Sequence, residues 1–593
     1  MYLVITSNDS YFLNNNEDLV LLGKWCLNNK DLKNNKIEYV FDYNWVDFNE
    51  NIKDQKYLYS LYKKIVSKIS QKLNIYHKKN YNEKYWEYLL GHWLWLYVIN
   101  LYDRYLYVKK AKDKYPEINL TVNSNKYYYA TSDEFWNLLK DDEYNNYLFS
   151  NIILNINNKF NKRIINKSFK KKEKLKRKKI KNLKYLLNYL LHQIRIIKHF
   201  FYEKYGNNLN YFIDLNSPLS FKEKKEIYKK LNQVFFTPHV LFINFKKIFS
   251  IKDIHKSINI IGRSQQLGLE HNNEFELLIN KTILGDFPLE YMELYDKIKS
   301  KISKYLPKKI PKIVLVRSQT ETNTNLRFTI SELVNKNSKI ISFQEGGGVG
   351  SKVASEYSEK IFNRLSDIWL NWGWKSENPK TKKFFFTKNF WIKDYIYNKN
   401  GNLLIVGSSC RRYFVDFHNG QLPYYNEIQM KLNKELISKL DKNIFKDLIY
   451  RLHFKFGYNE DKKLKNTFKN IKLSFREDET HHYNLLNNSK LVICTSDFTN
   501  FKQSFVVNHP TILLWDQNYF KFRDSAKIYY DTLEKNNILF YNPSKCAEFI
   551  NKIYNDPLKW WLSKEVQKAR NLFMNEFCKK TKNLPKEFVK LIK

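Results

Sequence analysis

The stretch of sequence best suited to chemistry is QEGGGVG at residues 344–350, directly after an apolar run at 339–343 that predicts a strand. Glycines allow a backbone to approach a ligand closely. A helix predicted to begin near Lys352 would add free N–H groups and a positive dipole end, which attract an anion. The spacing matches neither the Walker A phosphate loop nor the G-x-G-x-x-G dinucleotide fingerprint. A tight structural turn is the competing interpretation.

A second candidate site lies within LVICTSDFTNFKQSFVVNHPTILLW at residues 491–515. A strand predicted over 491–495 ends in hydroxyl and carboxylate side chains, just before a predicted helix that runs to Val507. Hydroxyl groups at the carboxyl end of a strand, next to a helix N-terminus, suit a phosphate or sugar in the crevice of an α/β sheet. Helix capping by Asp497 or Thr499 is the competing interpretation.

Arginine and histidine supply the remaining candidates. Arg451 lies near the end of a helix predicted over 432–452, and a buried arginine can bind a phosphate through two hydrogen bonds. An exposed arginine that lies along the surface is the competing interpretation. His481 and His482 are adjacent rather than one helical turn apart, and no Glu-x-x-His motif accompanies them, so we predict no bound metal. The sequence also lacks a G-x-S-x-G nucleophile motif.

Alternating apolar runs and helical patterns over residues 310–555 must position these side chains. Such alternation is typical of parallel sheets covered by helices. A polar seam near 375–400 divides the runs into two sets, which predicts two α/β lobes with a cleft between them. The predicted strands are 312–317, 339–343, 368–372, 402–407, 471–475, 491–495 and 510–515.

The first 205 residues are predicted to be mainly helical after short apolar runs at 2–6 and 19–26. Apolar residues recur every three to four positions from residue 54 to 111, which indicates helices. The most apolar segment, LLGHWLWLYVI at 89–99, is too short to cross a bilayer and predicts a buried amphipathic helix.

Composition excludes several classes of protein. The 593 residues are 43% hydrophobic and contain only 15 Gly and 12 Pro, so neither wholesale disorder nor a collagen-like structure fits. Five widely spaced cysteines imply no disulfide framework. The first residues, MYLVITSNDSYF, do not read as a signal peptide, so we expect a cytoplasmic protein.

The chain is strongly basic: 102 Lys+Arg against 60 Asp+Glu gives a net charge of +42. A solvated basic surface and attraction to a polyanion both fit this charge. The densest basic run, at 159–184, is interpreted as a solvated helix or linker, or as a contact with an anionic membrane surface. Aromatic residues are few within it, so nucleic acid is an unlikely partner.

Three stretches resemble transferases encoded in bacterial surface-polysaccharide (O-antigen-type) gene clusters: 21–26, 344–375 and 491–570. A weaker resemblance covers Trp93 and residues 102–105. The glycine loop and the Trp-Gly-Trp piece are also similar to those of capsule glycosyltransferases of the two-lobed GT-B type. The resemblance implies an α/β fold with two Rossmann-like lobes and a large helical N-terminal elaboration. It also implies a nucleotide-sugar donor, a glycan or lipid-linked glycan acceptor, and no metal or other cofactor.

On this resemblance the chain divides into N-terminal strands plus a helical elaboration (1–205), an N-terminal α/β lobe (206–385), a C-terminal α/β lobe (386–555) and C-terminal helices that cross back to the N-terminal lobe (556–593). Sugar transfer would take place at the inner membrane face. Glu345 would be catalytic, with Arg317 as a supporting cation. The donor would contact Gln344, Gly346, Gly347, Gly348, Arg451, Thr495, Thr499, Asn500 and Gln503.

Two positions depart from the family pattern. The family usually has His where this chain has Glu345, and Glu where it has Gln503. A carboxylate at 345 could serve as general base toward an acceptor hydroxyl if burial raised its pKa. The departures also leave open a catalytically degenerate binding or scaffold paralogue. A polyol-phosphate (teichoic-acid-type) transferase is a further alternative.

Overall fold

The computed structural model describes most of the chain. The described residues are 1–7, 17–28, 32, 35–168, 212–233, 235, 258–307, 309–318, 323–388, 395–408, 411–417, 422–453, 458–475 and 482–592. The apolar run at 240–245, the helical pattern at 186–205 and residues 169–184 of the basic run lie outside them. Three sheets form within the described residues, and every strand pairing in them is parallel.

The C-terminal sheet has the strand order β13-β12-β11-β14-β15-β16. The chain builds outward from β11 in one direction and then returns to add β14 on the other side. This reversal creates a topological switch point between β11 and β14, where open α/β sheets bind ligands at the carboxyl ends of their strands. The strands are β11 (Asn402–Val406), β12 (Leu448–Leu452), β13 (Lys472–Phe475), β14 (Ser489–Cys494), β15 (Thr511–Leu514) and β16 (Leu539–Phe540).

The middle sheet has the order β10-β9-β8-β7-β6, so its strands follow one another across the sheet without a reversal in the described residues. Together with the C-terminal sheet it confirms the predicted α/β class with two Rossmann-like lobes. Its strands and covering helices are β6 (Phe212–Asp214), β7 (Ile313–Arg317), α11 (Thr324–Asn335), β8 (Lys339–Phe343), α12 (Glu356–Arg364), β9 (Ile368–Asn371) and β10 (Thr381–Lys383).

The N-terminal unit contains a complete sheet of its own, with the order β3-β2-β1-β4-β5. The sequence predicted only its first two strands. The later strands escape prediction because β5 is exposed along most of its length and β4 begins and ends in asparagine. The elements are β1 (Tyr2–Val4), β2 (Leu19–Leu21), β3 (Ile37–Val40), α1 (Phe48–His77), α2 (Glu83–Lys114), β4 (Asn119–Asn123), α4 (Asp142–Asn155) and β5 (Asn161–Ile165).

Helix α2 is buried on almost all sides, because it packs against α1, α4 and α11. Every residue from Tyr85 to Leu101 is buried. The predicted helix at 89–99 is therefore present, but its amphipathic character is wrong. No helix in the described ranges is both long and apolar enough to cross a membrane.

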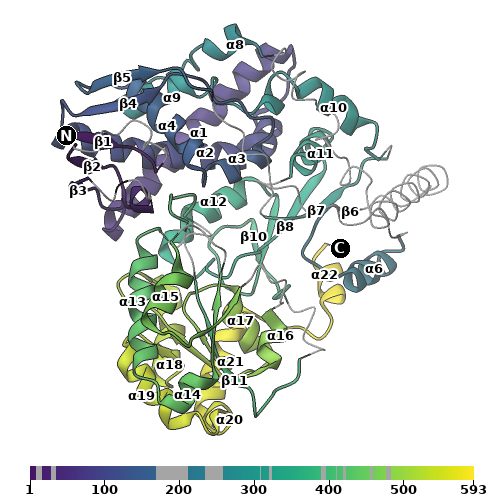
Figure 1. The fold of residues 1–593 in the computed structure, drawn as a ribbon. Coiled ribbons are helices and arrows are strands. Elements are labelled where there is room, and N and C mark those ends of the chain that lie inside the picture. Colours follow the sequence, from purple (N-terminus) through teal and green to yellow (C-terminus); the bar gives the residue numbers. More distant parts are fainter. Residues whose placement is uncertain are drawn as a thin grey trace, which may run out of the picture.

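The C-terminal helices connect the two lobes. After α21 (Lys564–Phe577), the backbone of Lys579 bonds to Trp372 and Phe386 of the middle lobe. Helix α22 (Leu584–Ile592) then packs on α6 (Phe221–Lys230) at the edge of the middle sheet (Figure 1).

A short segment of the C-terminal lobe docks into the N-terminal unit. Residues 411–417 follow β11, and their backbone accepts hydrogen bonds from α2. Arg104 Nη1 donates to the Phe414 carbonyl at 2.8 Å, and Asn100 Nδ2 donates to the Val415 carbonyl at 2.7 Å. Tyr413 OH donates to Asp142 at 2.6 Å. Four residues of this segment belong to the same hydrophobic core as the N-terminal sheet: Tyr413, Phe414, Val415 and Phe417.

We expect Arg104→Ala to destabilise the fold by about 3–5 kcal/mol, because the buried Asp103 carboxylate loses its cation and the Phe414 carbonyl loses the Arg104 donor. Arg163→Ala on exposed β5 is the matched control and should change stability by less than about 0.5 kcal/mol. Urea-induced unfolding measures both. Equal stabilities of the two variants would contradict this role of Arg104.

Candidate active site

The glycine loop at 344–350 meets the start of α17 (Thr499–Val506) across the two lobes. Lys502 Nζ donates to the Gly347 carbonyl. A Cβ on Gly347 would clash with the Phe498 backbone and lie 2.5 Å from the Thr499 nitrogen. The glycine therefore permits a close approach of two protein segments, and the approach to a ligand that the sequence suggested stays a prediction.

The buried carboxylate of Asp497 holds this contact together. It accepts hydrogen bonds from Ser351 Oγ at 3.1 Å and Tyr530 OH at 3.2 Å. Lys502 Nζ forms an ion pair with it at 3.4 Å. Burial raises the pKa of Tyr530 well above its usual value, so its hydroxyl keeps its proton and donates. One carboxylate thus binds groups from both lobes.

The helix predicted to begin near Lys352 is present: a 3-10 turn, η7 (Val353–Ser355), follows Lys352 and leads directly into α12. Lys352 itself forms a β-bridge with Phe522 of the C-terminal lobe. Glu359 in the first turn of α12 accepts from the Gly350 N–H at 2.8 Å and pairs with Arg523 at 2.8 Å. Burial raises the pKa of Glu359, and Arg523 opposes that shift. The anion site expected at this helix end stays a prediction, and the Glu359 carboxylate is one negative charge already close to it.

Glu345 lies in a charged cluster between the lobes, with a side chain only 10% exposed. Its Oε1 pairs with Lys388 Nζ at 2.8 Å and Arg317 Nη1 at 3.4 Å. Gln503 Nε2 donates to the Lys388 carbonyl at 3.4 Å. Three predicted residues therefore meet here. Lys388 was missed because it belongs to the polar seam, where nothing in the spacing distinguishes it from other lysines.

Gln344 holds the loop in place rather than pointing into an open site. It is 2% exposed, and its Oε1 accepts from the Trp372 N–H at 3.1 Å and Trp374 Nε1 at 2.9 Å. Its Nε2 donates to the Gly346 carbonyl at 2.8 Å. Gly350 has a φ of 82°, and a Cβ there would enter the Trp374 ring. The segment Trp372–Trp374 therefore holds the glycine loop in its conformation through Gln344.

The predicted donor residues of the C-terminal lobe lie at different depths. Thr495 is fully buried, and its hydroxyl donates to the Val406 carbonyl at 3.0 Å inside the sheet. Thr499 and Asn500 are half-buried in the first turn of α17. The N-cap residue Phe498 has no capping oxygen, and neither Asp497 nor Thr499 caps the helix. The first N–H groups of α17 thus remain uncapped by side chains.

Arg451 lies in strand β12, in register with Val406 of β11. The helix predicted over 432–452 is therefore wrong: α13 (Tyr425–Ser438) and α14 (Lys442–Asp447) precede the strand. The apolar spacing of the strand continues that of the helices, which hides the boundary. Arg451 is buried at the same carboxyl edge as Thr495.

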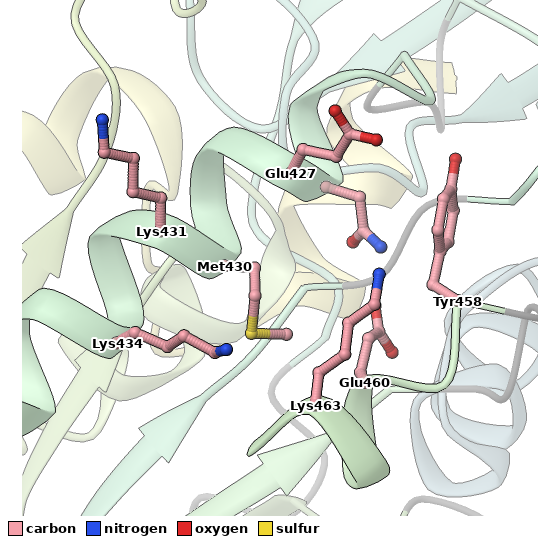
Figure 2. A pocket seen from close by; sticks show the side chains of 8 residues that line it. Glu427, Met430, Lys431, Lys434, Tyr458, Glu460 and Lys463 are labelled. Atoms are coloured by element: carbon pink, nitrogen blue, oxygen red, sulfur yellow. The ribbon is translucent and has the colours of Figure 1, made fainter. Parts of the chain in front are cut away.

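A separate hollow of about 400 Å³ opens between α13 and α15 (Glu460–Thr467). Figure 2 shows Lys434 of α13 and Lys463 of α15 on either side of Met430. None of the predicted site residues lines it. Its lining consists of Asn426, Glu427, Met430, Lys431, Lys434, Tyr458, Glu460 and Lys463.

No cluster of three or more His, Cys, Asp or Glu side chains suited to a metal ion occurs within the described ranges. His481 lies outside those ranges.

Comparison with known proteins gives one family and several solved structures. The model of the LIC12162 family transferase matches residues 1–592. No curated protein matches the chain. Spinosyn rhamnosyltransferase SpnG with spinosyn aglycone is 11% identical, covers 50% of this chain and 79% of its own, and has a TM-score of 0.27. A point mutant of S. aureus TarM with fondaparinux, alpha-GlcNAc-glycerol and UDP is 11% identical. The match covers 50% of this chain and 58% of TarM, with a TM-score of 0.32. The wall teichoic acid polymerase TagF is 10% identical. The match covers 70% of this chain and 97% of TagF, with a TM-score of 0.31.

We expect Gly347→Ala to lower the melting temperature, because the new methyl group must displace the start of α17 at a cost of about 1–3 kcal/mol. Gly285→Ala is the milder comparison and should lower the melting temperature less, since its Cβ would lie 3.3 Å from the Thr282 carbonyl oxygen rather than clash with it. Thermal unfolding without ligand measures both. An unchanged melting temperature for Gly347→Ala, with weakened ligand binding, would restore the interpretation that the glycine serves a ligand.

Proposed function

The chain belongs to the LIC12162 family of transferases, and from this membership we propose that it transfers a sugar from a nucleotide-activated donor to a surface glycan. The observation that carries the proposal is the switch point between β11 and β14. Its carboxyl edge faces the glycine loop of a second parallel sheet. Such an edge binds nucleotides in open α/β sheets.

The donor diphosphate would lie at the N-terminus of α17. Its first N–H groups lack a side-chain cap, and the dipole of the helix favours negative charge there. Thr499 and Asn500 would supply hydrogen bonds, and Arg451 adds a cation at the same edge of the sheet. Thr495 would stabilise the carboxyl end of β14 through the hydrogen bond from its buried hydroxyl to the Val406 carbonyl.

Glu345 would act on the acceptor from the middle lobe. A general base must reach the hydroxyl proton that it removes, and Glu345 lies between the lobes beside Gln503 and Lys388. Arg317 and Lys388 would hold the carboxylate in place. The proposal includes no metal. It places the enzyme in the cytoplasm and, through the basic run at 159–184, at the anionic inner face of the membrane.

We expect a nucleotide to raise the melting temperature in a screen of CMP, UDP, GDP and CDP compounds, since a ligand at 100 times its Kd stabilises the fold by about 2.7 kcal/mol. Thr499→Val should weaken this binding without changing the melting temperature of the free protein, because Thr499 is half-buried at a helix end. Turnover of CDP-glycerol instead of a nucleotide sugar would favour the polyol-phosphate alternative. Failure to bind any nucleotide would favour a scaffold.

We expect Glu345→Gln to lower turnover by roughly 10²- to 10⁴-fold, the usual effect of removing a general base. Nucleotide binding is the control and should persist, because Glu345 belongs to the middle lobe. If the carboxylate is instead the remnant of a lost histidine, Glu345→Gln has little effect. In that case the double variant Glu345→His/Gln503→Glu should be more active than the wild type. Equal turnover in all three proteins would exclude a catalytic role for residue 345.

A further inference from the structure

Lys352 differs from Lys502, which lies at the same contact between the lobes. Lys502 is fully buried, but its ammonium is bonded to Gly347 and Asp497. Lys352 is 7% exposed, and Arg523 Nε fixes its backbone carbonyl at 3.2 Å. Across the described part of the chain, its ammonium forms neither a hydrogen bond nor an ion pair.

The ammonium of Lys352 points toward the uncapped start of α17. It lies between two rings, 5.6 Å from the centre of Phe498, the N-cap residue of that helix, and 5.7 Å from the centre of Phe520. A Cβ placed on Gly348 would lie 2.5 Å from Lys352 Nζ and 3.2 Å from the Asp497 carbonyl oxygen. The ammonium is therefore next to the residues that lead from β14 into α17.

A buried ammonium without a partner destabilises a protein, because desolvation favours its neutral form. Burial lowers the pKa of Lys352, Asp497 and Asp416 oppose that shift, and Lys502 adds to it. By contrast, Glu359 nearby has three donors around it. Glu359 and Lys502 thus have charged or polar partners at the contact, whereas the Lys352 ammonium has only the Phe498 and Phe520 rings beside it.

We propose that Lys352 and the N-terminus of α17 together form a diphosphate-binding site, so that the middle lobe contacts the donor held on the C-terminal sheet. Only the identity of the anion rests on the proposed function: the site itself requires two phosphate groups and no nucleoside. Neither the glycine spacing nor the strand-end hydroxyls pointed to Lys352.

This contact gives Lys352 a part in sugar transfer. The acceptor oxygen forms a bond to the anomeric carbon of the donor while its proton passes to Glu345. The bond between that carbon and the diphosphate oxygen breaks, and its electron pair stays on the oxygen. The Lys352 ammonium stabilises the negative charge that develops there, in a site that largely excludes water.

Calorimetric titration of the full chain with inorganic pyrophosphate, and then with UDP, GDP, CDP and TDP, tests the site. Lys352→Met keeps the length of the side chain without its charge and should weaken pyrophosphate binding by roughly 10- to 100-fold, the size of one lost charged hydrogen bond. Its melting temperature without ligand should equal or exceed that of the wild type. Lys360→Met on α12 is the control, since this half-exposed lysine pairs with Glu356.

Each outcome decides one question. Equal pyrophosphate binding by the wild type and Lys352→Met, or no binding by the wild type, overturns the site. A clear fall in melting temperature for Lys352→Met also overturns it, because the ammonium would then have a partner in the protein. Pyrophosphate bound through Lys352 without binding of any nucleoside diphosphate keeps the site and rejects the nucleotide donor. Nucleoside diphosphates bound equally by both proteins reject only the role of Lys352.

Discussion

The contact between the two lobes depends on one buried carboxylate, that of Asp497. A charge in the protein interior must be surrounded by donors, and this one draws them from both lobes: Ser351 from the middle lobe, and Lys502 and Tyr530 from the C-terminal lobe. Because Lys502 also bonds to the Gly347 carbonyl, the glycine loop is pulled against the start of α17. The loop therefore has little freedom to change shape without breaking this network.

The strands of the two lobes could be predicted because each is a short apolar run bounded by polar residues, as expected of strands buried on both faces. The runs at 312–317, 339–343, 402–407 and 491–495 all form strands. A strand whose side chains are largely exposed lacks such an apolar run. Strand β5, with its charged and exposed side chains, has no such signal.

The two segments of the contact between the lobes were predictable, but the directions of their side chains were not. The sequence indicated both segments that meet between the lobes. It could not indicate which way their side chains point, since Gln344 and Thr495 are turned inward by partners far away in the chain. Lys352 and Lys388 were hidden for a different reason. The chain contains 102 Lys and Arg, and nothing in the sequence distinguishes one lysine from another. Only the structure shows which lysines are buried and which form ion pairs.

The docking of residues 411–417 into the N-terminal unit also constrains how the protein is made. Ile5 and Phe417 belong to one hydrophobic core, although roughly 410 positions separate them. At a synthesis rate of roughly 5–20 residues per second, about 20–80 s pass between their appearance on the ribosome. During that interval the first sheet carries apolar surface that its final partner has not yet covered. Nascent chains of this kind are natural clients of chaperones, and slower translation lengthens their exposure.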